Sequence, residues 1–274
     1  MFNRDTVEKK ARMIRRDILD MTHAAGSGHP GGSLSSADLL AALYFTDQFR
    51  CNPYDPDWAE RDRFILSKGH TAPVLYSVLS RRGFFPTEEL KSLRRFGSRL
   101  QGHPKMEALP GLDCSSGSLG QGLSIANGIA FALKRRGSDA RVYCLLGDGE
   151  LQEGQVWEAA MFAPQHALDN VCAIVDHNNI QLDGRVDEIK DVQPLREKWE
   201  AFRWHVVEVD GHDVAAVYHA YCAARACKGR PTVILARCIK GKGIPFMENS
   251  AKWHGTAPDD AEYIRAVHEL EVQE

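Results

Sequence analysis

The stretch of this chain with the clearest chemical potential is LLGDGELQEG, residues 145–154, which sets Asp148 between two glycines directly after an apolar run. That run, residues 141–146, is typical of a buried strand in a parallel sheet. Open α/β sheets bind ligands at the carboxyl ends of their strands, so Asp148 lies where a ligand-binding group is expected.

One interpretation of this loop is a dinucleotide-binding turn, because Gly147 and Gly149 follow a strand. In that interpretation Asp176, at the end of the next strand, could bind a ribose. Two features oppose it. The third glycine is Gly154, which gives GxGxxxxG in place of GxGxxG. Asp148 also stands where the backbone would approach a pyrophosphate, and a carboxylate repels that anion unless a cation lies between them. The pattern therefore favours an anion held through a metal ion.

The next strand supplies a second candidate metal ligand. The segment AIVDHNNI covers residues 173–180, and the strand is expected to end near Asp176, which leaves Asn178 in the following loop. A right-handed crossover through a helix over 154–167 brings that loop to the same sheet edge as Asp148. Mg²⁺ takes six oxygen ligands and often combines a few protein oxygens with phosphate oxygens and water. Asp148 and Asn178 are therefore predicted to share one hard cation with a diphosphate.

Several segments occur in the order seen in transketolases, and together they span nearly the whole chain. The chain resembles the N-terminal, diphosphate-binding segment of that family, in which a GDG loop followed by an Asn-rich strand end is the thiamine diphosphate signature. The resemblance implies the thiamine diphosphate-binding fold and a two-carbon ketol transfer from a ketose phosphate to an aldose. The segments are 27–31 (SGHPG), 61–70 (RDRFILSKGH), 102–104 (GHP), 116–122 (SGSLGQG), 147–149 (GDG) and 253–255 (WHG).

The resemblance assigns roles to individual positions. Asp148, Asn178 and the carbonyl of Ile180 correspond to the ligands of a divalent metal, by default Mg²⁺ with Ca²⁺ or Mn²⁺ as alternatives. Lys240 corresponds to a cofactor contact, with Lys242 as the alternative. The full set implied to bind thiamine diphosphate is His70, Gly117, Ser118, Leu119, Asp148, Gly149, Glu153, Asn178, Lys240 and His254.

The roles of the glycine, turn and acidic positions in this set need further comment. Gly149 allows the backbone to approach the diphosphate, and residues 117–119 run beside the thiamine ring, although some family members carry proline at position 118. Glu153 and Glu158 are either acids that interact favourably with a helix N-terminus or, by the resemblance, part of an acidic network at a dimer contact.

Four histidines share one context, because His29, His70, His103 and His254 each adjoin a glycine in an apparent loop. Cleavage of the C2–C3 bond of a ketose needs a base and proton donors, and imidazoles serve both roles near neutral pH. By the resemblance, His29 and His254 face the reacting carbons, His103 contacts hydroxyls of the two-carbon fragment, and His70 lies nearer the diphosphate. A zinc site is the competing reading, but the irregular spacing matches no zinc signature.

Other histidines receive less specific readings. His177, beside Asn178, lies either behind the metal site or in solvent. His212 is assigned no role, because its segment, 210–213 (DGHD), is typical of a strand exit and helix cap.

The elements that must position these residues follow from the hydrophobic pattern. Strands alternating with helices predict an α/β fold, a parallel sheet with helices on both faces, in one diphosphate-binding domain over residues 1–274. Strands are expected at 63–66, 141–146, 171–176, 204–209 and 232–238, and helices at 4–22, 35–45, 72–82, 87–95, 120–136, 154–167, 213–227 and after 259.

Composition narrows the class of protein. A formal net charge of −3 gives no electrostatic footprint for nucleic acid. The N-terminus is charged throughout, and no apolar run approaches the roughly 18 residues of a membrane span. Seven cysteines without a CxxC pair favour reduced thiols. The chain is therefore expected to be a cytoplasmic protein without a membrane partner.

The resemblance also implies what must come from elsewhere. A full transketolase carries a pyrimidine-binding domain, whose glutamate promotes ylide formation, and a further domain. We expect both on a separate C-terminal subunit, in an α2β2 assembly. The default substrates are sugar phosphates of the pentose phosphate pathway. The alternatives are a specialised sugar-catabolic transketolase, a deoxyxylulose-phosphate synthase-like enzyme, or a thiamine diphosphate-binding module without activity.

Overall fold

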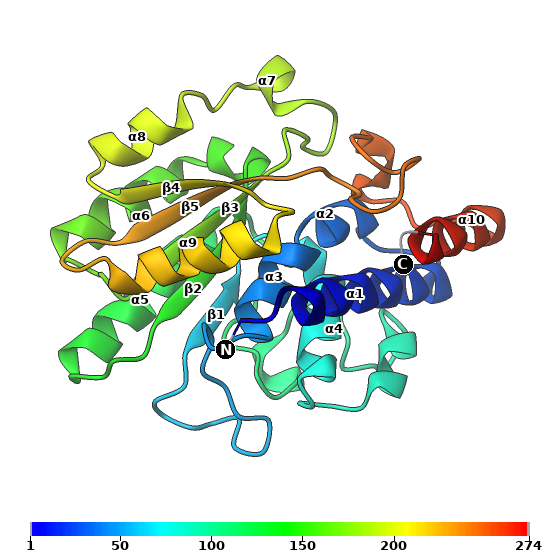
Figure 1. Cartoon of the computed structure of the whole chain (residues 1–274), viewed down its shortest axis with the longest axis horizontal. Coiled ribbons are helices and arrows are strands. Elements are labelled where there is room, and N and C mark those ends of the chain that lie inside the picture. Colours follow the sequence, from blue (N-terminus) through cyan, green and yellow to red (C-terminus); the bar gives the residue numbers. More distant parts are fainter. Residues whose placement is uncertain (1, 273–274) are drawn as a thin grey trace.

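The structure of the protein is a computed structural model that describes residues 2–272. At its centre is a five-stranded sheet with the order β1-β2-β3-β5-β4, in which all neighbouring strands are parallel (Figure 1). The strands are β1 Arg63–Leu66, β2 Val142–Gly147, β3 Val171–His177, β4 His205–Asp210 and β5 Thr232–Arg237. Each lies within one residue of its predicted bounds at either end.

The central strands are apolar on both faces, which explains their unbroken hydrophobic runs. Tyr143 and Leu145 of β2 belong to one buried cluster, whereas Val142 and Cys144 belong to the cluster on the other face. Successive side chains of a strand point to opposite faces, so both faces of the sheet must be covered.

Helices cover each face, as the hydrophobic pattern predicts (Figure 1). One buried cluster contains residues of α1 Arg4–Ala25, α3 Ala37–Tyr44, α4 Ala72–Arg81, α9 Val214–Ala226 and α10 Asp260–Glu271. The other contains residues of α5 Gln121–Arg135, α6 Gly154–Gln165 and α8 Leu195–Ala201. The remaining helices are α2 Pro30–Ser35, α7 Val186–Ile189 and the 3₁₀ segments Gly69–Thr71, Thr87–Ser92, Met106–Ala108, Gly149–Gln152 and Ala251–His254.

One helix prediction is wrong in type. The helix expected over 87–95 is a 3₁₀ segment, Thr87–Ser92, and the chain beyond it leaves helical geometry, with Arg94 in the left-handed region at φ 59°. The helix expected over 35–45 corresponds to α3, whose bounds lie within two residues of the prediction. Helices α2, α7 and α8 were not predicted.

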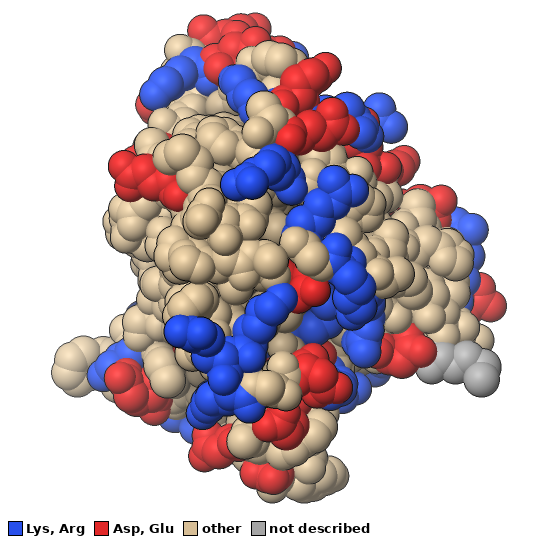
Figure 2. All heavy atoms as spheres, turned by 90° about the vertical axis from the view of Figure 1, so that its left-hand side faces the viewer, with Lys and Arg blue, Asp and Glu red and all other residues tan. Residues whose placement is uncertain are grey.

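The surface carries charges of both signs. Figure 2 views the molecule from the left-hand side of Figure 1, and on that face Lys and Arg side chains gather in a band with Asp and Glu side chains beside it. Among residues 2–272, no helix combines the length and the apolar character that crossing a membrane requires.

Candidate functional site

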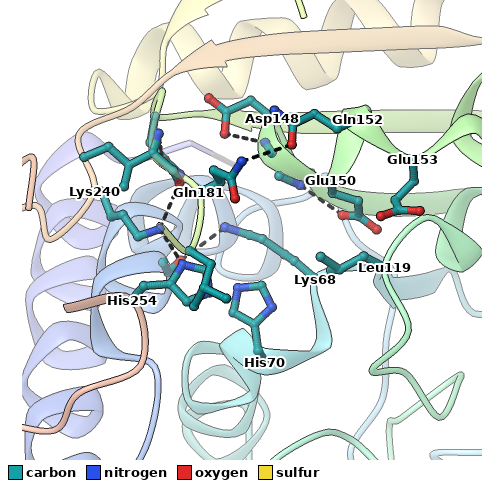
Figure 3. A pocket seen from close by; sticks show the side chains of 16 residues that line it. Lys68, His70, Leu119, Asp148, Glu150, Gln152, Glu153, Gln181, Lys240 and His254 are labelled. Atoms are coloured by element: carbon teal, nitrogen blue, oxygen red, sulfur yellow. Dashed lines mark hydrogen bonds between the residues drawn. The ribbon is translucent and has the colours of Figure 1, made fainter. Parts of the chain in front are cut away.

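A cavity of about 280 Å³ lies at the carboxyl ends of the central strands. In Figure 3, His70 and His254 lie on one side of this space and Asp148 and Gln152 on the other, with Lys68 and Gln181 between them. The lining residues predicted from sequence are His70, Leu119, Asp148, Gly149, Glu153, Asn178, Ile180, Lys240 and His254. The lining residues not predicted are Gly32, Lys68, Gly147, Glu150, Gln152, Gln181 and Leu182.

Asp148 is a buried carboxylate, only 2% exposed, at the start of the 3₁₀ segment Gly149–Gln152. Its oxygens accept hydrogen bonds from the backbone N–H groups of Gly149, at 2.8 Å, and Asn179. Burial, and then the negative charge of Asp176, raises the pKa of Asp148 to about 7. Two backbone N–H groups and the ammonium of Lys240 favour the charged form but do not offset the burial, so a divalent cation beside this carboxylate would stabilise it further.

Two further oxygens complete a donor set. The register of β2 and β3 pairs Gly147 with Asp176, so the loops that follow the two strands are adjacent. The side-chain oxygen of Asn178 accepts from the N–H of Ile180 at 3.1 Å, and the carbonyl of Ile180 accepts from Nζ of Lys240 at 2.9 Å. A carboxylate, an amide and a carbonyl oxygen in one cavity are the hard ligands that suit Mg²⁺, so the residues present fit this metal.

Gly149 packs closely against the loop after β3. A Cβ atom at this position would lie 2.8 Å from Cβ of Gln181. The glycine is therefore needed for the approach of two protein segments beside the cavity, in addition to the approach of a diphosphate inferred from the resemblance.

Lys68 and Asp176 form a buried ion pair behind the metal-ligand loops. Nζ of Lys68 donates to the carboxylate of Asp176, to Oγ of Ser36 at 2.8 Å and to the carbonyl of Gly32 at 3.2 Å. Although burial opposes ionisation, the Lys68 ammonium holds the pKa of Asp176 well below its usual range. Asp176 is fully enclosed, so it is not placed to bind a ribose as the dinucleotide reading required.

The four glycine-adjacent histidines form one cluster, although they come from distant parts of the chain. The ring centroid of His29 lies 5.1 Å from that of His70, 5.7 Å from His254 and 6.3 Å from His103. The rings of His70 and His254 lie 5.0 Å apart. This clustering accounts for the shared glycine context, because each histidine lies in a loop or a short 3₁₀ segment that reaches the same space.

Burial keeps these imidazoles neutral. It lowers the pKa of His29 to about 4, of His70 to about 2 and of His254 to about 3, and nearby positive charges act in the same direction. Nδ1 of His254 lies 2.8 Å from Nζ of Lys240. Because an ammonium only donates, Nδ1 accepts, and the neutral ring carries its proton on Nε2.

Arg94 is a neighbour of the cluster that sequence reasoning missed. Its guanidinium donates to Oγ of Ser27 at 2.7 Å and lies 3.2 Å from Nδ1 of His29. It also lowers the pKa of His103, after burial. No spacing in the sequence identifies Arg94, because its direction depends on its left-handed backbone.

Glu150 and Lys68 also line the cavity, and both could have been predicted from the sequence. Each is a charged residue shortly after a predicted buried strand. Glu150 is 2% exposed and accepts hydrogen bonds from Oγ of Ser67 and the N–H groups of Gly120, at 2.8 Å, and Gly147, at 3.1 Å. It therefore ties the ends of β1 and β2 to the start of α5.

The predicted site residues His29, His103, Gly117 and Ser118 do not line the main cavity, and neither does Glu158. Gly117 and Ser118 line a neighbouring hollow with Gln121, and the Cα of Gly117 faces the ring of His103. Glu158 lies in a separate hollow on α6, with Met161.

The chain is similar to known proteins over almost its whole length. The family model described as "Transketolase, thiamine diphosphate binding domain" matches residues 6–271. The chain is 43% identical over 267 residues to the 6-deoxy-6-sulfo-D-fructose transketolase subunit SqwG of Clostridium sp. (strain MSTE9), covering 97% of each chain. It is 38% identical over 266 residues to an apulose-4-phosphate transketolase subunit of Phocaeicola vulgatus, covering 97% of this chain and 94% of the relative.

Longer proteins match the same region. The transketolase of Homo sapiens is 43% identical over 246 residues, which are 89% of this chain and 39% of the human protein. A crystal structure of Pichia stipitis transketolase in complex with sedoheptulose 7-phosphate superposes with a TM-score of 0.92 at 32% identity, covering 97% of this chain and 41% of that one. The chain thus spans nearly all of the relatives named as subunits and well under half of the longer transketolases.

Proposed function

This chain belongs to the transketolase family, and we propose that it is the thiamine diphosphate-binding N-terminal subunit of a two-subunit transketolase. Such an enzyme transfers a two-carbon ketol unit from a ketose phosphate to an aldose acceptor. The observation that carries the proposal is the meeting, in one cavity, of the oxygens of Asp148, Asn178 and Ile180 with Lys240 and His254.

In this proposal the oxygens of Asp148, Asn178 and Ile180 hold Mg²⁺, or Ca²⁺ or Mn²⁺ in its place, and the metal carries the diphosphate of the cofactor. The donor chemistry supports the metal, and so does the burial of Asp148, which its hydrogen bonds and Lys240 offset only in part. Lys240 and His70 are assigned to the diphosphate, Gly117, Ser118 and Leu119 to the thiamine ring, and Glu153 to the same binding region. When bound, thiamine diphosphate supplies the thiazolium that stabilises the two-carbon fragment as a carbanion.

Proton transfer is assigned to His29, His103 and His254. Their clustering and neutral state support this role, because a neutral imidazole has one N–H that can donate a proton and one lone pair that can accept one. Arg94, which contacts His29, orients that ring. The neutral His254 carries its proton on Nε2, which makes this atom a donor toward a developing alkoxide.

The proposed enzyme also requires a second chain. Relatives that this chain matches over almost their whole length are themselves named as transketolase subunits, whereas the longer transketolases extend well beyond the matched region. We assign residues 1–274 to one diphosphate-binding domain, and the pyrimidine-binding and C-terminal domains to a separate chain in an α2β2 assembly. The seven free cysteines are consistent with a reducing compartment, and we place the protein in the cytoplasm.

The proposed substrates are ketose and aldose sugars. One relative is named for 6-deoxy-6-sulfo-D-fructose and another for apulose 4-phosphate. These names support the hypothesis of a specialised sugar-catabolic transketolase as an alternative to an enzyme of the pentose phosphate pathway. A ketose cleavage assay with a panel of phosphorylated and sulfonated ketoses, in the presence of the C-terminal partner, tests the activity. Turnover of one ketose supports the enzyme, and cofactor binding without any turnover would favour a non-catalytic module.

A further inference from the structure

A buried polar triad of Arg15, Asp38 and His212 lies beside the loop that carries Lys240. Arg15 comes from α1, Asp38 from α3 and His212 from the connection between β4 and α9. The guanidinium of Arg15 donates to both carboxylate oxygens of Asp38, one of them at 3.1 Å, and Nδ1 of His212 lies 2.7 Å from the same carboxylate. None of the three lines the cofactor cavity.

The triad bonds to the backbone on both sides of Lys240. The N–H of Ile239 donates to Nε2 of His212 at 2.8 Å. Nε of Arg15 donates to the carbonyl of Lys242 at 3.0 Å. The residue before Lys240 and the second residue after it are therefore anchored to the same three side chains.

The hydrogen bonds fix the tautomer of His212. A backbone N–H can only donate, so Nε2 of His212 must carry the lone pair, and Nδ1 carries the hydrogen that it donates to Asp38. Although burial opposes ionisation, Arg15 and His212 hold the pKa of Asp38 below its usual value, so the acceptor is a carboxylate. Asp38 thereby keeps His212 in the form that accepts from Ile239.

The Lys240 loop lies outside regular structure. It follows β5, which ends at Arg237, and Gly241 and Gly243 have φ values of 80° and 94°. The triad acts together with two backbone bonds, because the N–H of Gly241 donates to the carbonyl of Gly31 at 3.0 Å and the N–H of Asn249 donates to the carbonyl of Lys240 at 2.9 Å. A Cβ at Gly243 would lie 3.0 Å from Cδ of Arg15, so the loop packs directly on the triad. A lysine side chain has four rotatable bonds, so the contacts of its ammonium with Ile180 and His254 also depend on how well its backbone is held.

We propose that Arg15, Asp38 and His212 are positioning residues that hold the ammonium of Lys240 in the cofactor site through the backbone of residues 239–242. The inference rests on the proposed role of Lys240 as a contact of the cofactor diphosphate. The three residues do not touch the cofactor, and they act only through the loop.

A double-mutant cycle in the full chain tests this role. His212→Phe keeps a ring and removes the acceptor for Ile239, and it is measured alone and combined with Lys240→Met. Calorimetry gives the Kd of thiamine diphosphate with saturating Mg²⁺. We expect His212→Phe to weaken binding about tenfold when Lys240 is present and to have no further effect when Lys240 is replaced.

A second variant and a control separate positioning from general stability. Arg15→Lys keeps a positive charge near Asp38 but loses the planar fork that reaches Lys242, and we expect the same dependence on Lys240. Tyr221→Phe removes a buried hydrogen bond from α9 to the carbonyl of Leu39 in α3, at 3.0 Å, without touching the loop. It should lower the unfolding midpoint and leave the cofactor Kd unchanged.

The outcomes are distinct. Equal weakening in the presence and absence of Lys240, or unchanged affinity in both His212→Phe and Arg15→Lys, would overturn the positioning role while cofactor binding by the unaltered chain stands. If the unaltered chain does not bind, or Lys240→Met binds as tightly as the unaltered chain, the proposed role of Lys240 fails and the inference fails with it.

Discussion

Nζ of Lys240 donates a hydrogen bond of 2.9 Å to the carbonyl oxygen of Ile180. This contact places a positive charge on an oxygen that we assign to the metal. The same ammonium lies 2.8 Å from Nδ1 of His254, so it joins the proposed metal ligands to the histidine cluster. The side chains that we propose for metal binding, diphosphate binding and proton transfer are thereby linked through one ammonium, and their roles can be separated by mutation.

Replacing a metal ligand should abolish cofactor binding and leave the fold intact. Asp148→Ala and Asn178→Ala each remove one ligand from a set that suits a hard divalent cation. Calorimetry should show that the unaltered chain binds thiamine diphosphate only when Mg²⁺ is present, and circular dichroism should show native helix content in both variants. Equal binding in excess chelator would show that no metal mediates the interaction.

Breaking the buried ion pair behind these loops should destabilise the protein strongly. Lys68→Met leaves Asp176 as an unpaired buried charge, which typically costs about 3–5 kcal/mol in the free energy of unfolding. Arg4→Met is the matched control, because its pair with Glu8 is exposed to solvent and such pairs contribute little to stability. Urea denaturation measures both, and a loss for Lys68→Met as small as that of the control would refute the argument.

Much of the site could be predicted because its residues follow recognisable strands. Asp148 and Asn178 lie in loops directly after β2 and β3, and parallel strands bring such loops to one sheet edge. Arg94 follows no strand and could not be found in this way, whereas His212 does follow β4, but its position alone does not reveal its partners. Arg94 reaches His29 through a left-handed backbone, and His212, for which the sequence predicts no role, bonds to Asp38 of α3 and to Ile239. Such contacts depend on tertiary structure that hydrophobic periodicity does not encode.

The boundary between α2, which the sequence did not predict, and α3 has a similar origin. The hydroxyls of Ser35 and Ser36 both donate to the carboxylate of Asp176 on β3. A polar contact with a residue distant in sequence therefore accompanies the break at Ser36.

The acid stability of the chain without cofactor should depend on His29. Burial, together with the charge of Arg94 and the rings around it, lowers the pKa of His29 to about 4, against about 6.5 in an unfolded chain. Between these values the unfolded state binds a proton that the folded state does not, so stability is present above pH 6.5 and is lost as the pH falls toward 4. Urea unfolding at pH 7.5, 5.5 and 4.5 should show a shallower decline for His29→Asn than for the unaltered chain. Parallel declines would mean that His29 titrates normally in the fold.

Replacing the histidines assigned to proton transfer should lower turnover far more than cofactor affinity. His29→Ala and His254→Ala, assayed with the C-terminal partner, should each reduce kcat by roughly 10²–10⁴-fold, as expected for loss of a general acid or base. His205→Ala is a suitable control, because His205 lies at the start of β4 and contacts Thr232. A loss confined to the Kd of the cofactor would assign both histidines to binding.

The central claim is that this chain is the cofactor-binding half of a transketolase and depends on a second chain for activity. A coupled ketose cleavage assay on the purified chain, with saturating thiamine diphosphate and Mg²⁺, tests it most directly when run with and without the C-terminal partner. We predict no measurable cleavage by the chain alone, although it binds the cofactor, and steady turnover when the partner is added at equal concentration. Full turnover by the single chain, or no turnover of any tested ketose by the pair, would contradict the claim.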